Sequence, residues 1–439
     1  MLKKLFRFSV IVLMFVGIFF GLNVTIRRLF PNIEKQEAEA NIFNKIQSTS
    51  IALTNFYTYG RAFNVSGKIP NISKDNFESV RLVITDGLEF EESYNLNYEF
   101  SENDLVFSSS EKINSGIILD KLENSKYYIL LRLKVNNSVN PKYYSFSNGS
   151  DNEELTYYSV TQDGNNKKAE ILFLTKEFAE NEYTVLTIEV SDAKLPEDVY
   201  DIVIDAGHGG KDAGEKQGDI TEADITLDYA KTLKTSLEAQ GFKVKLTRDD
   251  NNTDSFTYND MYDEDGRISL ACSSKAKLMI SLHLNNGIND LNGFEIYAPC
   301  KSNLDFAEQM AKCIKNNTSI NFSNNKSFKE KEGVYLRNFT KNEIKASSDT
   351  SKSKGFEPYL ITTDTPYLYT IREVGGVATG AYADGRNTAY SKNKYYDSNQ
   401  GIECYQLELG YIKTDLNTIL DEKENYIDAI TEAILNYTK

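Results

Sequence analysis

The sequence predicts an all-β, sandwich-like domain followed by an α/β domain with a mixed, largely parallel sheet flanked by helices, both preceded by an N-terminal transmembrane helix. Residues 51–195 hold short runs rich in β-branched and aromatic residues, separated by clusters of Asn, Ser, Gly and Asp, a pattern typical of a sandwich. From residue 196 onward, strand-like runs alternate with segments of helical periodicity, which indicates an α/β fold. Residues 8–26 carry no charged side chain.

Composition and charge limit the classes of protein to consider. The chain has 439 residues, 40% of them hydrophobic and 26% charged, which is ordinary for a globular protein of two or three domains. Its 49 Lys and Arg against 64 Asp and Glu give a net charge of −15. Because nucleic-acid affinity comes largely from cationic side chains on phosphates, a nucleic-acid partner is not expected.

The uncharged run at residues 8–26 predicts a membrane anchor. As a helix it would rise about 28 Å, close to the thickness of the hydrocarbon core of a bilayer. Lys3, Lys4 and Arg7 precede it, and no small-x-small cleavage site follows. We therefore expect residues 1–30 to be an uncleaved, single-pass anchor in the cell membrane and residues 31–50 a polar stalk. The remaining chain would lie on the extracytoplasmic side.

No catalytic cluster is apparent in the β-rich residues 51–195, which contain neither histidine nor cysteine. This stretch is best interpreted as a spacer or a binding module. All four cysteines of the chain come later and form no C-x-x-C pair, so a cysteine zinc site is not expected. Disulfides and buried free thiols are equally compatible with the pattern.

Residues 196–439 divide into elements by their periodicity. A strand over residues 199–205 runs into a glycine-rich turn. Thr221 is a suitable N-cap for a helix over residues 221–240, which Gly241 ends. Further strands are expected at residues 242–246, 278–284 and 294–298, and further helices at residues 267–276 and 305–316.

The only two histidines both fall where a strand is predicted to end. His208 lies in D-A-G-H-G-G and His283 in S-L-H-L-N-N. Ligands of open α/β sheets gather at the carboxyl ends of strands, and zinc sites commonly combine imidazoles with a carboxylate. Glu222 is an attractive third ligand because it starts a helix, although the pattern alone cannot choose among the nearby carboxylates Asp205, Asp212, Glu215, Asp219, Glu222 and Asp224.

A general base is the second requirement for metal-assisted hydrolysis. Glu408 lies in the apolar run Y-Q-L-E-L-G-Y, where a carboxylate is costly unless it is paired or has a task. Glu403 and Glu373 compete for this role.

Four fragments together resemble one known family. D-A-G-H-G-G-K-D-A-G, T-E-A-D, S-L-H-L-N-N and L-E-L-G-Y are similar, in this order, to zinc-dependent N-acetylmuramoyl-L-alanine amidases. The resemblance covers residues 199–439. It implies Zn²⁺ held by His208, Glu222 and His283, with Glu408 as the catalytic carboxylate. It also implies hydrolysis, by a zinc-bound water, of the amide between N-acetylmuramic acid and L-alanine in peptidoglycan.

The sequence departs from this family after residue 373. A long Gly- and Tyr-rich segment separates Arg372 and Glu373 from Glu408. Arg372 is a candidate for binding a carboxylate of the stem peptide, and an ion pair with a neighbouring carboxylate is an equal alternative. Asn285 and Asn286 are candidates for orienting the substrate, although an Asn in a loop is more often a turn residue.

Three functions are compatible with these observations. The first is a membrane-anchored cell-wall amidase acting on peptidoglycan, with or without a protein activator. The second is a catalytically inactive or autoinhibited wall-binding or activator protein that keeps the amidase fold. The third is a zinc peptidase that cuts within the stem peptide. The first is favoured because all four expected chemical groups are present.

Overall fold

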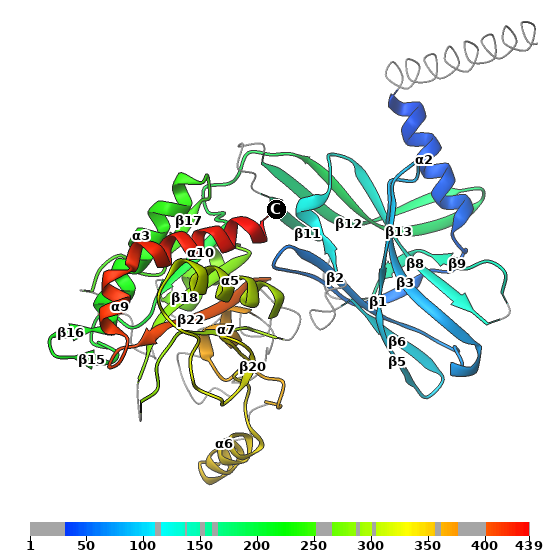
Figure 1. Cartoon of the computed structure of the whole chain (residues 1–439). Helices are drawn as coiled ribbons and strands as arrows, with labels where there is room; N and C mark the ends of the chain where they lie inside the picture. Colours follow the sequence, from blue (N-terminus) through cyan, green and yellow to red (C-terminus); the bar gives the residue numbers. More distant parts are fainter. Residues whose placement is uncertain are drawn as a thin grey trace, which may run out of the picture.

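The computed structural model describes residues 31–109, 116–136, 138–149, 154–159, 166–251, 266–286, 290–300, 304–355, 361–375 and 401–438 (Figure 1). Two large apolar cores organise these residues, one within a β-sandwich and one within an α/β part. None of the four cysteines, which are Cys272, Cys300, Cys313 and Cys404, forms a disulfide in the described chain.

The sandwich is built from two sheets. One has the strand order β10-β1-β2-β6-β5 with β7 paired to β2, and the other the order β11-β12-β13-β8-β3-β4 with β9 paired to β8. Their bounds are β1 (Ile51–Tyr59), β2 (Ala62–Ile69), β3 (Phe77–Thr85), β4 (Glu91–Asn95), β5 (Asn97–Ser101), β6 (Asp104–Ser108), β7 (Ile117–Ile118), β8 (Lys126–Val135), β9 (Lys142–Tyr144), β10 (Phe146–Asn148), β11 (Glu154–Ser159), β12 (Lys167–Phe178) and β13 (Asn181–Asp192). Short 3₁₀ turns occupy Lys74–Asn76 and Leu119–Lys121.

Alternating side chains along these strands fill the space between the sheets. Phe56 of β1 and Phe63 of β2 are fully buried there, together with Leu82 of β3 and Ile129 of β8. Because successive residues of a strand point to opposite faces, their neighbours lie on the outer faces.

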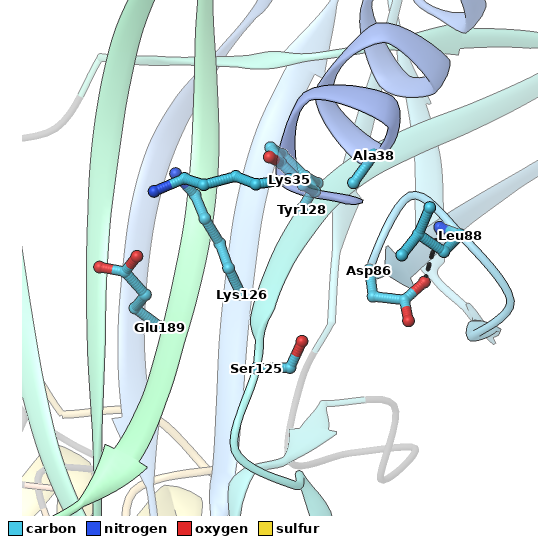
Figure 2. Close-up of a pocket in the computed structure, with 8 residues that line it drawn as sticks. All are labelled: Lys35, Ala38, Asp86, Leu88, Ser125, Lys126, Tyr128 and Glu189. Carbon is cyan, nitrogen blue, oxygen red and sulfur yellow. Dashed lines mark hydrogen bonds between the residues drawn. The ribbon is translucent and has the colours of Figure 1, made fainter. Parts of the chain in front are cut away.

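The residues predicted as a polar stalk form helix α2 (Pro31–Lys45), which lies against the outer face of the sandwich (Figure 1). Ile42 and Phe43 pack there on Val83, Tyr128 and Val185. Beside this contact is a pocket of about 360 Å³, in which the amines of Lys35 and Lys126 lie over Glu189 (Figure 2). Charges of both signs therefore line this pocket.

The α/β part has one seven-stranded sheet with the order β17-β14-β18-β22-β19-β21-β20. Strands β17, β14, β18 and β22 are mutually parallel, and β19 runs antiparallel to β22. The strand bounds are β14 (Ile202–Ala206), β17 (Val244–Leu246), β18 (Leu278–Asn285), β19 (Glu295–Tyr297), β20 (Lys329–Lys331), β21 (Val334–Tyr335) and β22 (Glu403–Tyr411), with a separate hairpin of β15 (Lys216–Gln217) and β16 (Ile220–Thr221).

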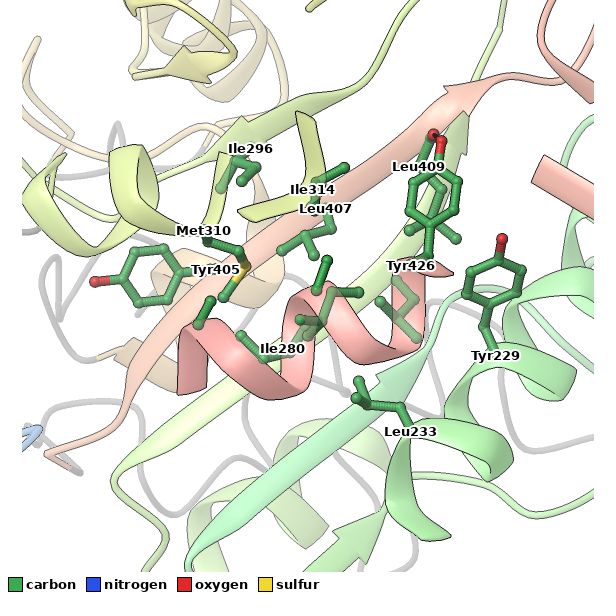
Figure 3. Close-up of a cluster of buried hydrophobic side chains, with 14 of the residues drawn as sticks. Tyr229, Leu233, Ile280, Ile296, Met310, Ile314, Tyr405, Leu407, Leu409 and Tyr426 are labelled. Carbon is green, nitrogen blue, oxygen red and sulfur yellow. Dashed lines mark hydrogen bonds between the residues drawn. The ribbon is translucent and has the colours of Figure 1, made fainter. Parts of the chain in front are cut away.

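Helices cover both faces of this sheet. Their bounds are α3 (Glu222–Ala239), α4 (Arg267–Ser273), α5 (Leu304–Asn317), α6 (Lys341–Ser353), α7 (Tyr369–Gly375), α9 (Leu416–Asp421) and α10 (Lys423–Tyr437). Helices α3, α5 and α10 bury one face in the large core that includes Leu233, Met310 and Tyr426 (Figure 3). Helices α4 and α7 pack on the other face, where Ile268 and Ile371 join a smaller core.

The sandwich contacts the α/β part through a buried ionic cluster. Arg61 Nε donates to Asp120 Oδ2 at 2.7 Å, both within the sandwich. Lys277, which directly precedes β18, has its Nζ 3.5 Å from Asp120 Oδ1. Arg61 also donates to the carbonyl of Tyr437 at the end of α10. The Gly60 N–H donates to the Gly401 carbonyl just before β22 at 2.7 Å.

The fold class predicted from the sequence requires correction. In the described chain more residues lie in strands than in helices, and none of its helices is long and apolar enough to cross a bilayer. The predicted transmembrane helix is therefore wrong as part of the fold class. The prediction depended on the apolar residues 8–26 and on the sequence around them, and residues 1–30 lie outside the described residues. The first described helix, α2, is polar.

Candidate metal centre

His208, Glu222 and His283 come from three different elements and meet at one point. Their ligand atoms all lie within 4.8 Å of one another. His208 directly follows β14, His283 lies near the end of β18, and Glu222 is the first residue of α3. The two parallel strands end side by side, so both imidazoles reach the same edge of the sheet.

Local backbone features bring these side chains together. His208 adopts a left-handed conformation with φ +61° between Gly207 and Gly209, an unusual backbone for a residue with a side chain. A Cβ at Gly207 would overlap the His283 ring, so only glycine fits there. The Thr221 side chain accepts the Asp224 N–H at 3.1 Å and caps α3, which fixes Glu222 in the first turn.

Glu222 is the hub of the cluster. Its Oε1 lies 3.1 Å from both His208 Nε2 and His283 Nδ1 and accepts the Leu284 N–H at 2.8 Å. Its Oε2 accepts the Glu215 N–H at 3.0 Å. Burial alone would raise the pKa of Glu222, but hydrogen bonds from the two histidines hold it well below its usual value. The carboxylate is therefore kept ionised.

The environment of the two imidazoles suits a bound cation. His208 Nδ1 is hydrogen-bonded to Asp212 Oδ2 at 2.8 Å, the outer contact that typically orients a metal-ligating histidine. His283 Nε2 is buried without a hydrogen-bond partner among the described residues, and leaving such an atom unpaired costs about 1–3 kcal/mol. Two imidazoles and one carboxylate are a common zinc donor set, so the residues present fit this metal.

Glu408 stands directly beside His283. The register of β18 and β22 pairs these two residues, and β19 pairs Glu295 with Glu408 from the other side. Directly paired residues point to the same face of a sheet, so the three side chains form a row. Glu408 Oε1 accepts from Gln406 Nε2 at 2.8 Å, whereas its buried Oε2 has no partner in the described part of the chain.

Burial raises the pKa of Glu408 to about 7, against the opposing effect of His283 and with a further contribution from the negative charge of Glu222. A carboxyl group of this pKa can both take up and release a proton near neutral pH. The arrangement therefore combines a cation site with an adjacent acid–base group, as in metal-assisted hydrolases.

Register separates Glu408 from its sequence competitors. Glu403 pairs with Leu278 at the opposite end of the same two strands, about 16 Å along the strand from Glu408. Glu373 is buried and forms an ion pair with Arg372 Nε at 3.1 Å. Arg372 Nη1 also donates to the carbonyls of Pro366 and Tyr367. Of the two roles expected for Arg372, the structure therefore contains the ion pair with a neighbouring carboxylate.

The other candidate ligands have different partners. Asp205 is fully buried in an ion pair with Arg267 Nη1 at 3.2 Å, and it accepts from the hydroxyls of Ser281 and Thr247. Asp224 accepts from the hydroxyl of Thr221. Asp205 therefore lies in the layer beneath the cluster rather than in it.

Asn285 and Asn286 end β18 next to His283. Asn286 Nδ2 donates to Glu215 Oε1 at 2.8 Å, and Lys413 Nζ lies 3.4 Å from Asn286 Oδ1. Asn285 Nδ2 is buried without a partner among the described residues. Both asparagines thus adjoin the cluster, while residues 376–400 of the inserted segment lie outside the described residues.

Two polar residues of the site escaped the sequence analysis. Glu295 is fully buried and accepts hydrogen bonds from Tyr297, Tyr411 and Ser323. Gln406 lies between Thr370 and Glu408. A carboxylate within the apolar run F-E-I-Y-A is the same signal that singled out Glu408, and it could have identified Glu295.

One known family matches a segment of the chain that contains the cluster. Residues 202–347, about a third of the chain, match the family described as N-acetylmuramoyl-L-alanine amidase. The resemblance seen in the sequence is thereby confirmed for this segment. The segment includes all three residues of the cluster, and Glu408 lies beyond it.

Curated relatives match over similarly short stretches. The chain is 36% identical over 97 residues to the N-acetylmuramoyl-L-alanine amidase LytC of Bacillus subtilis, covering 22% of this chain and 18% of that protein. It is 36% identical over 90 residues to the germination-specific N-acetylmuramoyl-L-alanine amidase of the same organism, covering 19% of this chain and 38% of that protein. The chain thus spans well under half the length of either relative.

Among solved structures, the amidase AmiC2 of Nostoc punctiforme is 22% identical with a TM-score of 0.35, covering 55% of this chain and 97% of that one.

Proposed function

We propose that this protein is a zinc-dependent N-acetylmuramoyl-L-alanine amidase. Its substrate would be the amide that joins N-acetylmuramic acid to L-alanine in peptidoglycan. The observation that carries the proposal is the Oε2 of Glu408, which has no partner among the described residues and lies beside the cluster of His208, Glu222 and His283. We take residues 196–439 as the catalytic domain and residues 51–195 as an accessory domain, acting on the extracytoplasmic side where peptidoglycan lies.

His208, Glu222 and His283 would hold the zinc, which supplies a Lewis acid that activates water and polarises the scissile carbonyl. Glu408 Oε2 accepts the proton of the attacking water and returns it to the leaving nitrogen of alanine. Asp212 keeps His208 in the tautomer whose Nε2 faces the cluster. Glu222 brings negative charge that offsets the cation.

The experiment is digestion of purified peptidoglycan by the full chain, with mass spectrometry of the products. Stem peptides that carry a new L-alanine amine, together with peptide-free glycan, would support the amidase. Cleavage inside the stem peptide would show that the protein is a peptidase and not an amidase. Absence of any product from a zinc-loaded chain would favour an inactive or autoinhibited wall-binding protein and overturn the proposal.

A further inference from the structure

Within the part of the chain that the structure describes, the carboxylate of Glu408 is held through one oxygen. Gln406 Nε2 donates to Glu408 Oε1 at 2.8 Å, while Glu408 Oε2 is buried without a partner in the described chain. The two residues are two positions apart on β22, so their side chains share a face of the sheet. The contact therefore leaves a defined oxygen of Glu408 available.

Gln406 is itself held in place. The hydroxyl of Thr370, a fully buried residue of α7, donates to Gln406 Oε1 at 3.3 Å. This hydrogen bond directs the amide N–H₂ of Gln406 toward the carboxylate. The reverse orientation would put the amide oxygen against the negative charge of Glu408.

The two faces of β22 differ sharply in polarity. Tyr405, Leu407 and Leu409 belong to the apolar core on one face (Figure 3). On the other face Gln406 pairs with Ser281 of β18 and Tyr297 of β19, one layer beneath Glu408. A buried amide is costly unless it is fully hydrogen-bonded. The Gln406 amide donates to Glu408 and accepts from Thr370. Its acceptor, Glu408, is the group that carries the proposed acid–base chemistry.

We propose that Gln406 is a positioning residue for Glu408, and that Thr370 fixes the amide of Gln406 for this purpose. The inference rests on the proposed amidase function. By occupying Oε1, Gln406 fixes the plane of the carboxylate and leaves Oε2 to face the reacting water. Catalytic groups must be held within about 0.5 Å of their productive position, which a single unsupported carboxylate does not achieve.

The kinetic test uses Gln406→Met in the full chain, because Met has nearly the same length and no N–H donor. Loss of one hydrogen bond to a charged group predicts a fall in kcat of about 10- to 100-fold. KM should change by less than about twofold and the zinc content should stay at the parent value, because neither depends on the orientation of Glu408. A parallel loss of zinc, or a rise in KM at constant kcat, would overturn the positioning role.

Thr370 provides a matched pair of variants. Thr370→Val keeps the shape but removes the hydroxyl, and it should lower kcat by about three- to fivefold. Thr370→Ser keeps the hydroxyl and should restore kcat to within about twofold of the parent. Equal kcat values for the Val and Ser variants would contradict the role of the hydroxyl.

A crystallographic readout separates this inference from the proposed function. In the parent chain Glu408 should show one carboxylate orientation, with Oε1 on Gln406, and in Gln406→Met that orientation should be lost. An unchanged Glu408 carboxylate in the variant would overturn the positioning role even if the parent is an active amidase. A parent chain without amidase activity would instead overturn the proposed function, and the two crystal structures would still decide whether Gln406 orients Glu408.

Discussion

His283 and Glu408 are directly paired across strands β18 and β22, and both point to the same face of the sheet. One belongs to the cluster that can hold a cation, and the other has a buried carboxylate oxygen without a partner in the described residues. The hydrogen-bonding register of two parallel strands therefore sets the separation of the proposed metal and the proposed acid–base group.

Glu222→Gln tests the cluster itself. The amide keeps the size of the side chain but removes its negative charge and one of its acceptor oxygens. We expect zinc affinity to fall by at least about 100-fold, since the anionic ligand is replaced by a neutral amide. Competition with a chelator measures this change. The exposed Asp219→Asn is the matched control, and equal zinc affinity in the two variants would refute the ligand role of Glu222.

Asp212→Asn tests the outer contact of His208. Asp212 Oδ2 is bonded to His208 Nδ1 at 2.8 Å, and such contacts typically change metal affinity or activity by about 10- to 100-fold. We expect zinc binding to weaken within that range while the fold remains stable. Zinc titration and circular dichroism of the same samples check both statements, and unchanged affinity would show that Asp212 does not orient the imidazole.

Asp120→Asn tests the contact between the sandwich and the α/β part. The variant leaves Arg61 and Lys277 facing each other without a counter-charge, and loss of a buried partner costs about 3–5 kcal/mol. The free energy of unfolding, measured in urea, should fall by that order. Lys134→Ala breaks the exposed pair with Glu78 and should cost less than about 1 kcal/mol. Similar losses in both variants would contradict a buried ionic contact.

The same carboxylate predicts a dependence of stability on pH. Burial would raise the pKa of Asp120, but Lys277 and Arg61 outweigh this effect and lower it to about 2. Because the folded pKa is depressed, the contribution is complete above pH 4 and is lost as pH falls toward 2. It amounts to about 2 kcal/mol. The difference in the free energy of unfolding between the parent and Asp120→Asn, measured in urea, should therefore shrink by this amount over this range. A constant difference between them would contradict the assignment.

Asp201 should give the opposite dependence of stability on pH. Burial raises its pKa to about 6, although Lys277 opposes the shift. A raised folded pKa gives stability that is complete below pH 4 and is lost as pH rises through about 6. Asp201→Asn should accordingly remove a decline in the free energy of unfolding between pH 4 and 7. If the free energy of unfolding of Asp201→Asn declines as in the parent, other groups must cause the decline.

Much of the site could be predicted because its chemistry is rare in this sequence. With only two histidines, both at strand ends, His208 and His283 were the only imidazole ligands to consider. From the residues alone, the choices between Glu222 and Asp205 and between Glu408 and Glu403 stayed open, and the family resemblance favoured Glu222 and Glu408. The structure adds a physical reason for each choice. Asp205 is neutralised by Arg267, and Glu403 lies at the far end of the strand.

The remainder depended on contacts distant in sequence. Arg61 bonds to Tyr437, 376 residues away, and no local pattern reports such a pair. Gln406 looked like an ordinary polar residue until the strand register placed it beneath Glu408. The apolar run at residues 8–26 predicted a transmembrane helix from local sequence, and this part of the predicted fold class needed correction.

The most direct test of the account compares Glu408→Gln with the parent for zinc affinity and amidase activity together. The account predicts full zinc binding in the variant, with kcat lowered by about 10²- to 10⁴-fold, because the acid–base group is lost while the cluster is intact. Retention of activity in Glu408→Gln would contradict the central claim that this carboxylate performs the proton transfer beside the His208, Glu222 and His283 cluster.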